Sequence, residues 1–368
     1  MLELVLEIHR NGGSLVKIGI IGTPQSGKST IFQLLTNVES SVSSKANVGI
    51  AKVPDPRISR LSLIFKPKRT TYATIEFVDI AGLVSGQSKK GNEFLKAVRD
   101  VDAIVQVIRA FENELVPTID GNISPIRDLN QIQSELILTD WSLLETRMEK
   151  LVKERVKNPN ATKELAVLEK CKDVLENDLP LRSLDLDEEE DKLIRGYDFF
   201  TRKPLLLVIN VDEDQIRSSS YLQQDELSVW ANERSMPLVM VSGQVEMEIN
   251  QLDDDDKAMF MTELGIEETG ISRLAQAVYE HLGLISYFTV GEDEVRAWTI
   301  RQGMSARQGA GKIHSDIERG FIRAEVVSNQ EFIEYGSMQK LKEKGLFRLE
   351  GKEYIIKDGD IINFRFNV

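Results

Sequence analysis

The residues best placed to do chemistry lie near the start of the chain, in a segment that fits the phosphate-binding pattern GxxxxGK[ST]. In this pattern the glycines let successive backbone N–H groups turn inward around a chain of phosphates. Lys28 is expected to reach the β- and γ-phosphates, and the Ser29 hydroxyl to be a magnesium ligand. The segment predicts a site for a nucleoside triphosphate. Its predicted binding residues are Gly22, Thr23, Pro24, Gln25, Ser26, Gly27, Lys28, Ser29 and Thr30.

The elements on either side of this loop favour the same interpretation. Residues 17–21 are typical of a buried strand, and residues 29–35 place apolar side chains at the spacing of a helix with one core face. A helix that starts here adds its partial positive charge where the phosphates would bind. The alternative is an accidental glycine-rich turn between a strand and a helix, which the Lys-Ser pair disfavours.

A second motif, DxxG, follows the strand predicted over residues 72–78 and runs from Asp79 to Gly82. In P-loop proteins of the GTPase type, the aspartate holds magnesium from the far side through water, and the glycine N–H senses the γ-phosphate. The next residue is usually a glutamine that orients the attacking water. Here it is Leu83, whose apolar side chain cannot do so.

The residues that would read the nucleotide base follow the strands predicted over residues 204–209 and 237–241. A guanine-specific site has the sequence NKxD, in which the lysine lies over the base and the aspartate accepts two hydrogen bonds from guanine. This chain has Val211 and Glu213 at those two positions, and losing such contacts costs on the order of 10⁴-fold in discrimination. We therefore do not expect guanine specificity. The predicted base pocket consists of Asn210, Val211, Glu213, Ser242, Gly243 and Gln244.

Apolar runs separated by helical patterns indicate the architecture. They predict an α/β fold with a mostly parallel sheet covered on both faces, in which phosphate binds outside the carboxyl ends of the strands. The predicted strands cover residues 17–21, 48–53, 72–78, 103–108, 204–209 and 237–241.

Two other regions have patterns of their own. Apolar residues at helical spacing within residues 126–200 predict a charged helical hairpin whose stripe packs between its own two helices, with a partner-binding coiled coil as the alternative. From residue 284 strand patterns return with balanced charges, which predicts a separate small α+β domain. The expected domains are a nucleotide-binding domain (16–125 and 201–283), the insert (126–200), the last domain (284–368) and an N-terminal extension outside the core (1–15).

The composition limits the classes of protein to consider. No apolar run approaches the length of a membrane span, so we expect no membrane partner. The single cysteine, Cys171, excludes an internal disulfide and favours the reducing cytoplasm, with a core role for this residue. The net charge of −13 argues against nucleic-acid binding over the whole surface, while a local basic patch would allow it. The acidic runs at residues 185–191 and 253–256 are expected to be solvated.

Taken together, these motifs resemble those of the YchF-type, Obg-like ATPases, members of the translation-factor-related P-loop GTPase class that prefer ATP. The resemblance covers nearly everything from Val16 to Val368. It implies a ubiquitin-like β-grasp (TGS) domain at the end of the chain, ATP (or GTP) and Mg²⁺ as cofactors, and the ribosome or ribosomal RNA as a partner. We expect a monomer. The motifs that carry the resemblance lie at residues 22–30, 47–49, 53–57, 79–84, 210–213, 287–300, 310–316, 320–325 and 358–368.

The chain departs from the family pattern at the catalytic positions. The switch segment before Asn47 is shorter than in the family, which leaves Ser43, with Ser44 as rival, as the second magnesium hydroxyl. The family replaces the missing glutamine with a histidine on the loop after residues 111–113, and Thr118 falls at that position here. The predicted catalytic residues are Lys28, Asp79, Gly82 and Thr118, and the predicted magnesium ligands are Ser29, Ser43 and Asp79.

Two hypotheses of different classes follow. The first is a slow ATPase used as a nucleotide-dependent switch, which the intact phosphate and magnesium residues favour. The second is an adaptor that binds ATP and a partner without significant hydrolysis, which Leu83 and Thr118 favour. A GTP-specific GTPase is a third possibility that depends on fold analogy alone.

Overall fold

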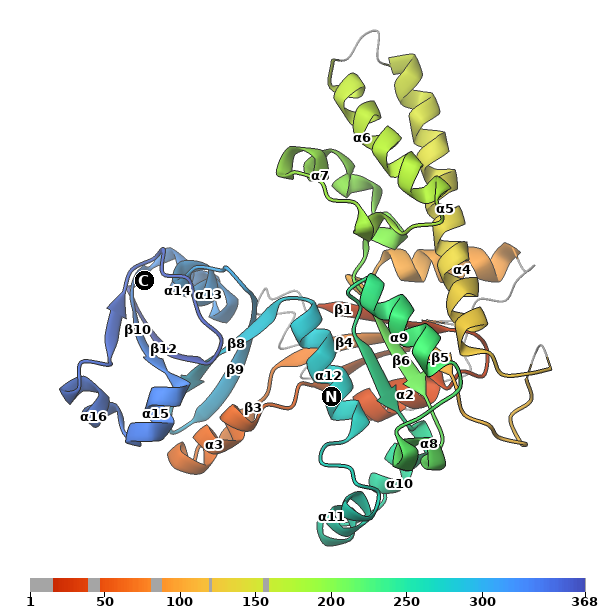
Figure 1. Ribbon diagram of the computed structural model, residues 1–368. Coiled ribbons are helices and arrows are strands. Elements are labelled where there is room, and N and C mark those ends of the chain that lie inside the picture. Colours follow the sequence, from red (N-terminus) through yellow and green to blue (C-terminus); the bar gives the residue numbers. More distant parts are fainter. Residues whose placement is uncertain (1–15, 39–46, 81–87, 119–120, 155–158, 368) are drawn as a thin grey trace. The chain divides into compact units, whose positions relative to one another are not determined.

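The computed structural model describes residues 16–38, 47–80, 88–118, 121–154 and 159–367 (Figure 1). The predictions for residues 1–15, Ser43, Ser44, Gly82 and Leu83 fall outside this range. Contacts divide the chain into two compact units. Among the described residues, the larger unit consists of those within 17–49 and 77–274, and the smaller one of residues 16, 50–76 and 275–367.

One six-stranded sheet has the order β2-β4-β1-β5-β6-β7. The pairs β1–β5, β5–β6 and β6–β7 are parallel, and every residue of β5 is buried because helices cover such a sheet on both faces. This confirms the predicted α/β class. The strands are β1 (Lys17–Gly22), β2 (Asn47–Lys52), β4 (Thr74–Asp79), β5 (Ala103–Arg109), β6 (Leu205–Asn210) and β7 (Leu238–Val241).

Helices follow these strands along the chain. The helix predicted after the phosphate-binding loop is α2 (Lys28–Thr36), and its apolar face is buried as expected. The solvated surface predicted for the second acidic run is confirmed, because residues 253–256 are exposed, and Asp253 caps the first turn of α11. The other helices of the sheet region are α4 (Ser88–Arg99), α8 (Glu213–Ser218), α9 (Gln224–Glu233), α10 (Gly243–Ile249), α11 (Asp254–Glu263) and α12 (Gly270–His281).

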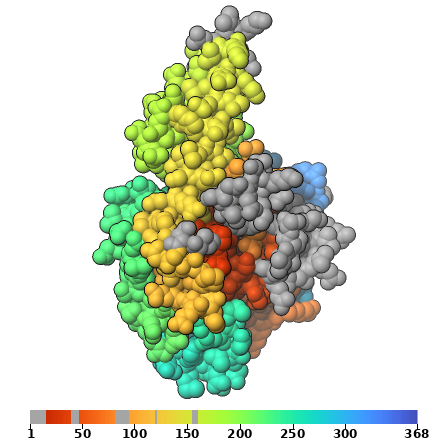
Figure 2. All heavy atoms as spheres, turned by 90° about the vertical axis from the view of Figure 1, so that its right-hand side faces the viewer, coloured from red at the N-terminus to blue at the C-terminus, as the bar shows by residue number. Residues whose placement is uncertain are grey.

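The helical insert projects from the larger unit as an arm (Figures 1 and 2). Its two long helices, α5 (Pro125–Glu154) and α6 (Pro159–Glu176), lie side by side. Cys171 is buried between them, and burial raises the pKa of its thiol to about 11, so it is a core residue as predicted. The arm also contains η1 (Leu181–Ser183), α7 (Glu188–Ile194), η2 (Arg195–Tyr197) and η3 (Phe200–Arg202).

The apolar stripe of α5 divides between two cores, which corrects the prediction that it packs only against its own hairpin. Leu129 and Leu136 belong to the core of the sheet, whereas Leu144 and Leu151 pack with residues of α6. Between these two parts lies Asp140, which is buried and accepts hydrogen bonds from the backbone N–H groups of Phe200 and Thr201 (2.9 and 2.7 Å). Helical periodicity shows which face of a helix is apolar but not what covers it.

The smaller unit contains a second, mixed sheet with the order β11-β10-β12-β8-β9-β3. Helix α13 packs against it, and the Tyr287 hydroxyl donates to the Gly309 carbonyl (2.9 Å). The strands are β3 (Arg69–Thr71), β8 (Leu284–Val290), β9 (Glu294–Arg301), β10 (Phe321–Ser328), β11 (Arg348–Glu350) and β12 (Asp360–Phe366). The helices are α3 (Pro56–Phe65), α13 (Ala306–Ile313), α14 (Ser315–Arg319), α15 (Asn329–Tyr335) and α16 (Met338–Glu343).

A segment from early in the chain belongs to this second sheet. Strand β3 pairs in parallel with β9, and Arg57 donates to Asp55 (2.8 Å) and to Asp358 (2.6 Å). The contact-based units therefore group residues 50–76 and 275–283 with the last strands, whereas the predicted boundaries place them in the nucleotide-binding domain. No helix among the described residues is long and apolar enough to cross a membrane.

Candidate nucleotide-binding site

The loop between β1 and α2 has the shape that its glycines predict. Gly27 caps α2 with φ of +92°, a left-handed conformation, and a Cβ atom there would lie 2.1 Å from Nδ2 of Asn210. At Gly22 a Cβ atom would lie 2.5 Å from the carbonyl oxygen of Val107. Both positions therefore require glycine.

Lys28 is held inside this loop. Its Nζ donates to the carbonyl oxygen of Thr23 (2.8 Å), and the residue is only 8% exposed. Burial lowers the pKa of Lys28 to about 8, although the nearby charge of Asp79 acts in the opposite direction. A buried ammonium that has one carbonyl partner is well placed to exchange it for phosphate oxygens.

Ser29 and Asp79 meet as the two motifs predict. The Ser29 hydroxyl donates to Oδ2 of Asp79 (2.9 Å), although the two residues are far apart in the chain. A hydroxyl and a carboxylate are hard oxygen donors of the kind that Mg²⁺ takes, usually with few protein ligands. In keeping with this, the described residues contain no cluster of three or more His, Cys, Asp or Glu side chains that would form an all-protein metal site.

Asn210 connects the phosphate-binding loop to the segment after β7. Its Nδ2 donates to the Ser26 carbonyl (3.0 Å), and its Oδ1 accepts from the Gly243 N–H (3.0 Å). The side chain is buried, so both of its polar ends are used within the protein. Asn210, predicted as a base-pocket residue, thus fixes the relative positions of two loops that bound the site.

The next residues of the same segment differ in exposure. Val211 is 2% exposed and belongs to the core of the sheet, so its side chain offers almost no surface to a base. Asp212 caps α8 by accepting from the Gln215 N–H (2.9 Å). Glu213 is more exposed and pairs with Arg217 (2.8 Å). Glu213 is therefore the least buried of the predicted base-pocket residues in this segment, and its carboxylate is held by Arg217.

The segment after β7 offers mainly backbone groups. Ser242 is buried and caps α10, with its Oγ accepting from the Val245 N–H (3.3 Å). Gln244 is exposed and donates to Glu248 (3.2 Å). The predicted contacts of this segment with a base would therefore come through the backbone. A Cβ at Gly243 would lie 3.2 Å from Cγ2 of Thr30.

The remaining loop residues also have defined surroundings. The Thr23 hydroxyl donates to Oδ2 of Asp128 (3.4 Å), and Figure 2 shows this red part of the chain beside the yellow-orange start of α5. Gln25, which follows Pro24, has a left-handed backbone with φ of +62°. The Ser26 hydroxyl is buried and has no hydrogen-bond partner in the described part of the chain, so the loop contains an unused polar group.

Thr118 is half-buried on the loop that follows β5. Arg109, which no motif predicts, ends β5 and contacts three carbonyl groups of that loop. The signal that identifies it is an arginine at the end of a buried, mostly apolar strand, at the edge where the phosphates are expected.

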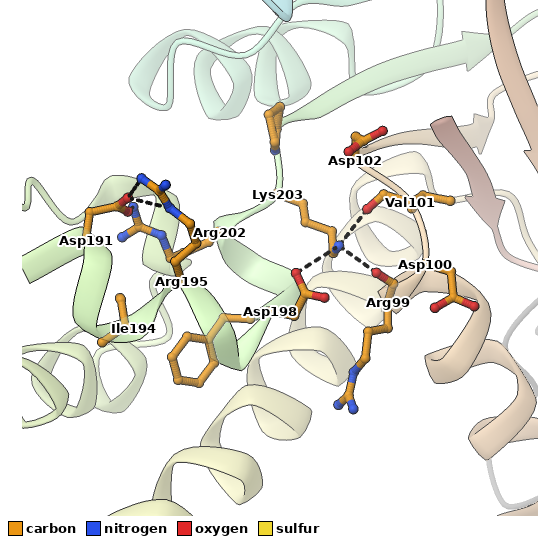
Figure 3. Close-up of a pocket in the computed structure, with 12 residues that line it drawn as sticks. Arg99, Asp100, Val101, Asp102, Asp191, Ile194, Arg195, Asp198, Arg202 and Lys203 are labelled. Carbon is orange, nitrogen blue, oxygen red and sulfur yellow. Dashed lines mark hydrogen bonds and ion pairs between the residues drawn. The ribbon is translucent and has the colours of Figure 1, made fainter. Parts of the chain in front are cut away.

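A pocket of about 460 Å³ lies at the opposite ends of β5 and β6, where the arm joins the sheet (Figure 3). Several of its charged groups are bonded within the lining. Lys203 donates to the carbonyls of Arg99 (2.9 Å) and Val101 (2.6 Å), and Asp191 pairs with Arg195 (2.7 Å). Because nucleotides bind outside the carboxyl ends of parallel strands, this pocket is not the nucleotide site.

Comparison with known proteins agrees with the geometry. Residues 17–140 match the family described as MMR_HSR1, 50S ribosome-binding GTPase. Residues 284–367 match the family described as YchF-GTPase_C, protein of unknown function (DUF933).

Full-length relatives extend the match to almost the whole chain. The ribosome-binding ATPase YchF of Bacillus subtilis is 43% identical over 363 residues, which cover 95% of this chain and 99% of that protein. The protein of the same name from Escherichia coli O157:H7 is 45% identical, with 96% and 99% covered. The solved structure of the Schizosaccharomyces pombe YchF GTPase has a TM-score of 0.86 at 32% identity and covers 96% of this chain and 98% of that one. By sequence and by structure, the chain belongs to the YchF family.

Proposed function

We propose that the protein binds ATP with Mg²⁺ in the loop between β1 and α2, hydrolyses it slowly, and acts as a nucleotide-dependent switch on the ribosome in the cytoplasm. The observation that carries the proposal is the meeting of Lys28, Ser29 and Asp79 at one edge of the sheet. The names of the bacterial relatives, ribosome-binding ATPases, support the choice of nucleotide and partner.

The phosphate-binding loop is tested by removing its lysine. Lys28→Ala is expected to abolish detectable ATP binding, because it removes the buried ammonium that would face the phosphates, while the far-UV circular dichroism stays unchanged. Lys150→Ala, which removes an exposed lysine of α5, is the matched control and should bind ATP like the unmodified protein. Equal affinities of the two variants would place the nucleotide elsewhere.

The preference for ATP is proposed from Val211 and Glu213. The buried Val211 cannot lie over a base as a lysine stem does, and Glu213 pairs with Arg217. Competition calorimetry is expected to show tighter binding of ATP than of GTP. The double variant Val211→Lys with Glu213→Asp should move the preference toward GTP, and tighter GTP binding by the unmodified protein would contradict the proposal. Because the Schizosaccharomyces pombe relative is called a GTPase, the competition between ATP and GTP decides between two nucleotides that names in the family suggest.

Slow hydrolysis of ATP is proposed from the residues available to hold Mg²⁺ and the attacking water. Ser29 and Asp79, with Ser43 as a further candidate, would hold Mg²⁺, which would supply charge neutralisation on the phosphates. Among the candidate residues, Thr118 is the one predicted to hold the attacking water, and a neutral hydroxyl is a weak base. Single-turnover assays with labelled ATP should give about 10⁻³ per second or less. Thr118→His should raise this rate several-fold, because imidazole is the better base.

The same assay separates the alternatives. Turnover of about one ATP per second by the unmodified protein alone, as in ordinary kinases, would mean that the catalytic set is complete. Tight binding with no turnover at all would favour the adaptor hypothesis instead.

The ribosome as partner is tested by co-sedimentation with and without ATP. Helix α13 carries Arg307, which is exposed, and Lys312. If this helix contacts phosphate groups of RNA, binding should weaken steeply with salt. Reversing both residues to glutamate should then reduce co-sedimentation, and unchanged co-sedimentation would reject this surface.

A further inference from the structure

Arg109 is the most unusual charged residue near the candidate site. It is 5% exposed, and all three of its side-chain nitrogens donate to carbonyl groups of the loop that follows it. The bonds reach Phe111 (3.3 Å), Pro117 (3.2 Å) and Val116 (2.9 Å), and the guanidinium carbon lies 4.4 Å from the centre of the Phe111 ring. The loop is therefore folded around one guanidinium group.

Burying this charge is unfavourable, so its placement needs a reason. Desolvation lowers the pKa of Arg109, and the charge of Asp128 offsets this in part. No described residue forms an ion pair with Arg109 that would compensate directly. The planar guanidinium, however, holds several donors in a fixed fork, which can bond to several carbonyl groups at once in a way that lysine cannot.

The two halves of the loop are attached to the protein in different ways. The first half is bound to the base-reading segment, because the N–H groups of Ala110 and Phe111 both donate to the Asn210 carbonyl (2.8 and 3.1 Å). The second half, among the described residues, is joined to the strand by the bonds of Arg109 to Val116 and Pro117. Thr118 follows directly in the chain. The N–H groups of Leu115 and Val116 also donate to Asn113 within the loop (2.8 and 3.1 Å), so the bonds of Arg109 are what ties this half, and Thr118 after it, back to the strand.

The same region connects to the phosphate-binding loop. Asp128, whose charge acts on Arg109, accepts a hydrogen bond from the hydroxyl of Thr23 (3.4 Å). Gly22, just before Thr23, lies opposite Val107 in the pairing of β1 with β5, two residues from Arg109. Arg109 therefore lies two residues beyond the position of β5 that pairs with Gly22, and each of its side-chain nitrogens already donates to a carbonyl group.

We infer that Arg109 is a positioning residue for hydrolysis: it holds the loop of residues 111–118 so that Thr118 stays at the phosphate site. The inference rests on the proposed function, in which ATP is hydrolysed at this site. Arg109 acts through the loop and does not contact the nucleotide. Its loss should therefore reduce the rate of hydrolysis and leave the affinity for ATP unchanged.

The test compares Arg109→Gln and Arg109→Lys with the unmodified full-length protein. In single-turnover assays Arg109→Gln should slow hydrolysis by about tenfold or more, since small displacements of a positioned group have large effects on rate. The dissociation constant for ATP, measured by calorimetry, should change by less than about twofold. Arg109→Lys should restore part of the rate, because it keeps the charge but not the fork. Arg147→Gln, which removes an arginine of the arm that pairs with Glu164, is the matched control.

Two readouts use ATP. The increase in hydrolysis rate caused by Thr118→His should vanish in a double variant with Arg109→Gln. It should persist in the control double variant with Arg147→Gln. An increase that persists in both double variants would overturn the inference. An ATP affinity that falls as much as the rate would also overturn it, because Arg109 would then contact the nucleotide.

A third readout does not depend on ATP. In the nucleotide-free protein, amide hydrogen exchange over residues 113–118 should be faster in Arg109→Gln than in the unmodified protein. Unchanged exchange would overturn the inference even if the protein hydrolyses no ATP. Faster exchange without any ATP turnover in the unmodified protein would support the role of Arg109 in holding the loop and reject the proposed function alone.

Discussion

The protonation of Lys28 provides a direct test of the site through pH. In the nucleotide-free protein burial lowers the pKa of Lys28 to about 8, and bound phosphates would raise it again. Binding well above pH 8 should therefore be accompanied by uptake of close to one proton. At pH 9 about one molecule in eleven carries the charge, so the affinity for ATP should be about tenfold lower than at pH 7.

The stability of the nucleotide-free protein should respond to pH in the opposite sense. Because folding lowers the pKa of Lys28 from 10.5 to about 8, the unfolded chain holds this proton more tightly than the folded protein does. The contribution of Lys28 to stability therefore increases as the pH rises from about 8 to 10.5. The difference in stability between the unmodified protein and Lys28→Met isolates this contribution from other titrating groups.

Calorimetry in two buffers of different ionisation enthalpy measures both the affinity for ATP and the number of protons taken up on binding. Without magnesium, proton uptake on ATP binding should be close to one at pH 9 and close to zero at pH 7. Asp79→Asn is the informative variant, because the charge of Asp79 raises the pKa of Lys28 and its removal should move the loss of affinity to lower pH. An affinity that is constant from pH 7 to 9, with no proton uptake, would refute the assignment of Lys28 as the buried phosphate-binding group.

Three further substitutions test the framework of the site and of the arm. Gly27→Ala should weaken ATP binding by about tenfold or more, because the position is left-handed and the new Cβ would collide with Asn210, and normal binding would contradict the loop geometry. Asn210→Ala should lower the free energy of unfolding by about 2 kcal/mol in urea titrations, since it leaves the Gly243 N–H without its acceptor. Asp140→Ala should lower it by about 3 kcal/mol through the unpaired donors of Phe200 and Thr201, whereas the exposed Asp173→Ala should have almost no effect. Equal losses for the last two variants would reject the buried network.

The sequence by itself determined the phosphate-binding loop and most of the first sheet. A strand, a glycine-containing turn and a helix follow one another from residue 17 to residue 36, so local conformational preferences are sufficient to identify them. The meeting of Ser29 with Asp79 also follows from motifs, because each motif ends its own strand at the same edge of a parallel sheet. The short apolar runs that became β5 and β6 are readable for the same reason: a strand buried on both faces has almost no polar positions.

The tertiary structure decided which distant groups meet. Strand β3 is too short to carry a pattern of its own, and only its pairing with β9 shows that it belongs to the second sheet. The Asn210 side chain forms hydrogen bonds to two loops, whose positions depend on the packing of β1, β6 and β7. No sequence pattern near Asn210 predicts those bonds. The role of Arg109 depends in the same way on a loop that folds back on its own strand. Periodicity and motifs describe neighbours along the chain, whereas buried hydrogen bonds are set by which segments the fold brings together.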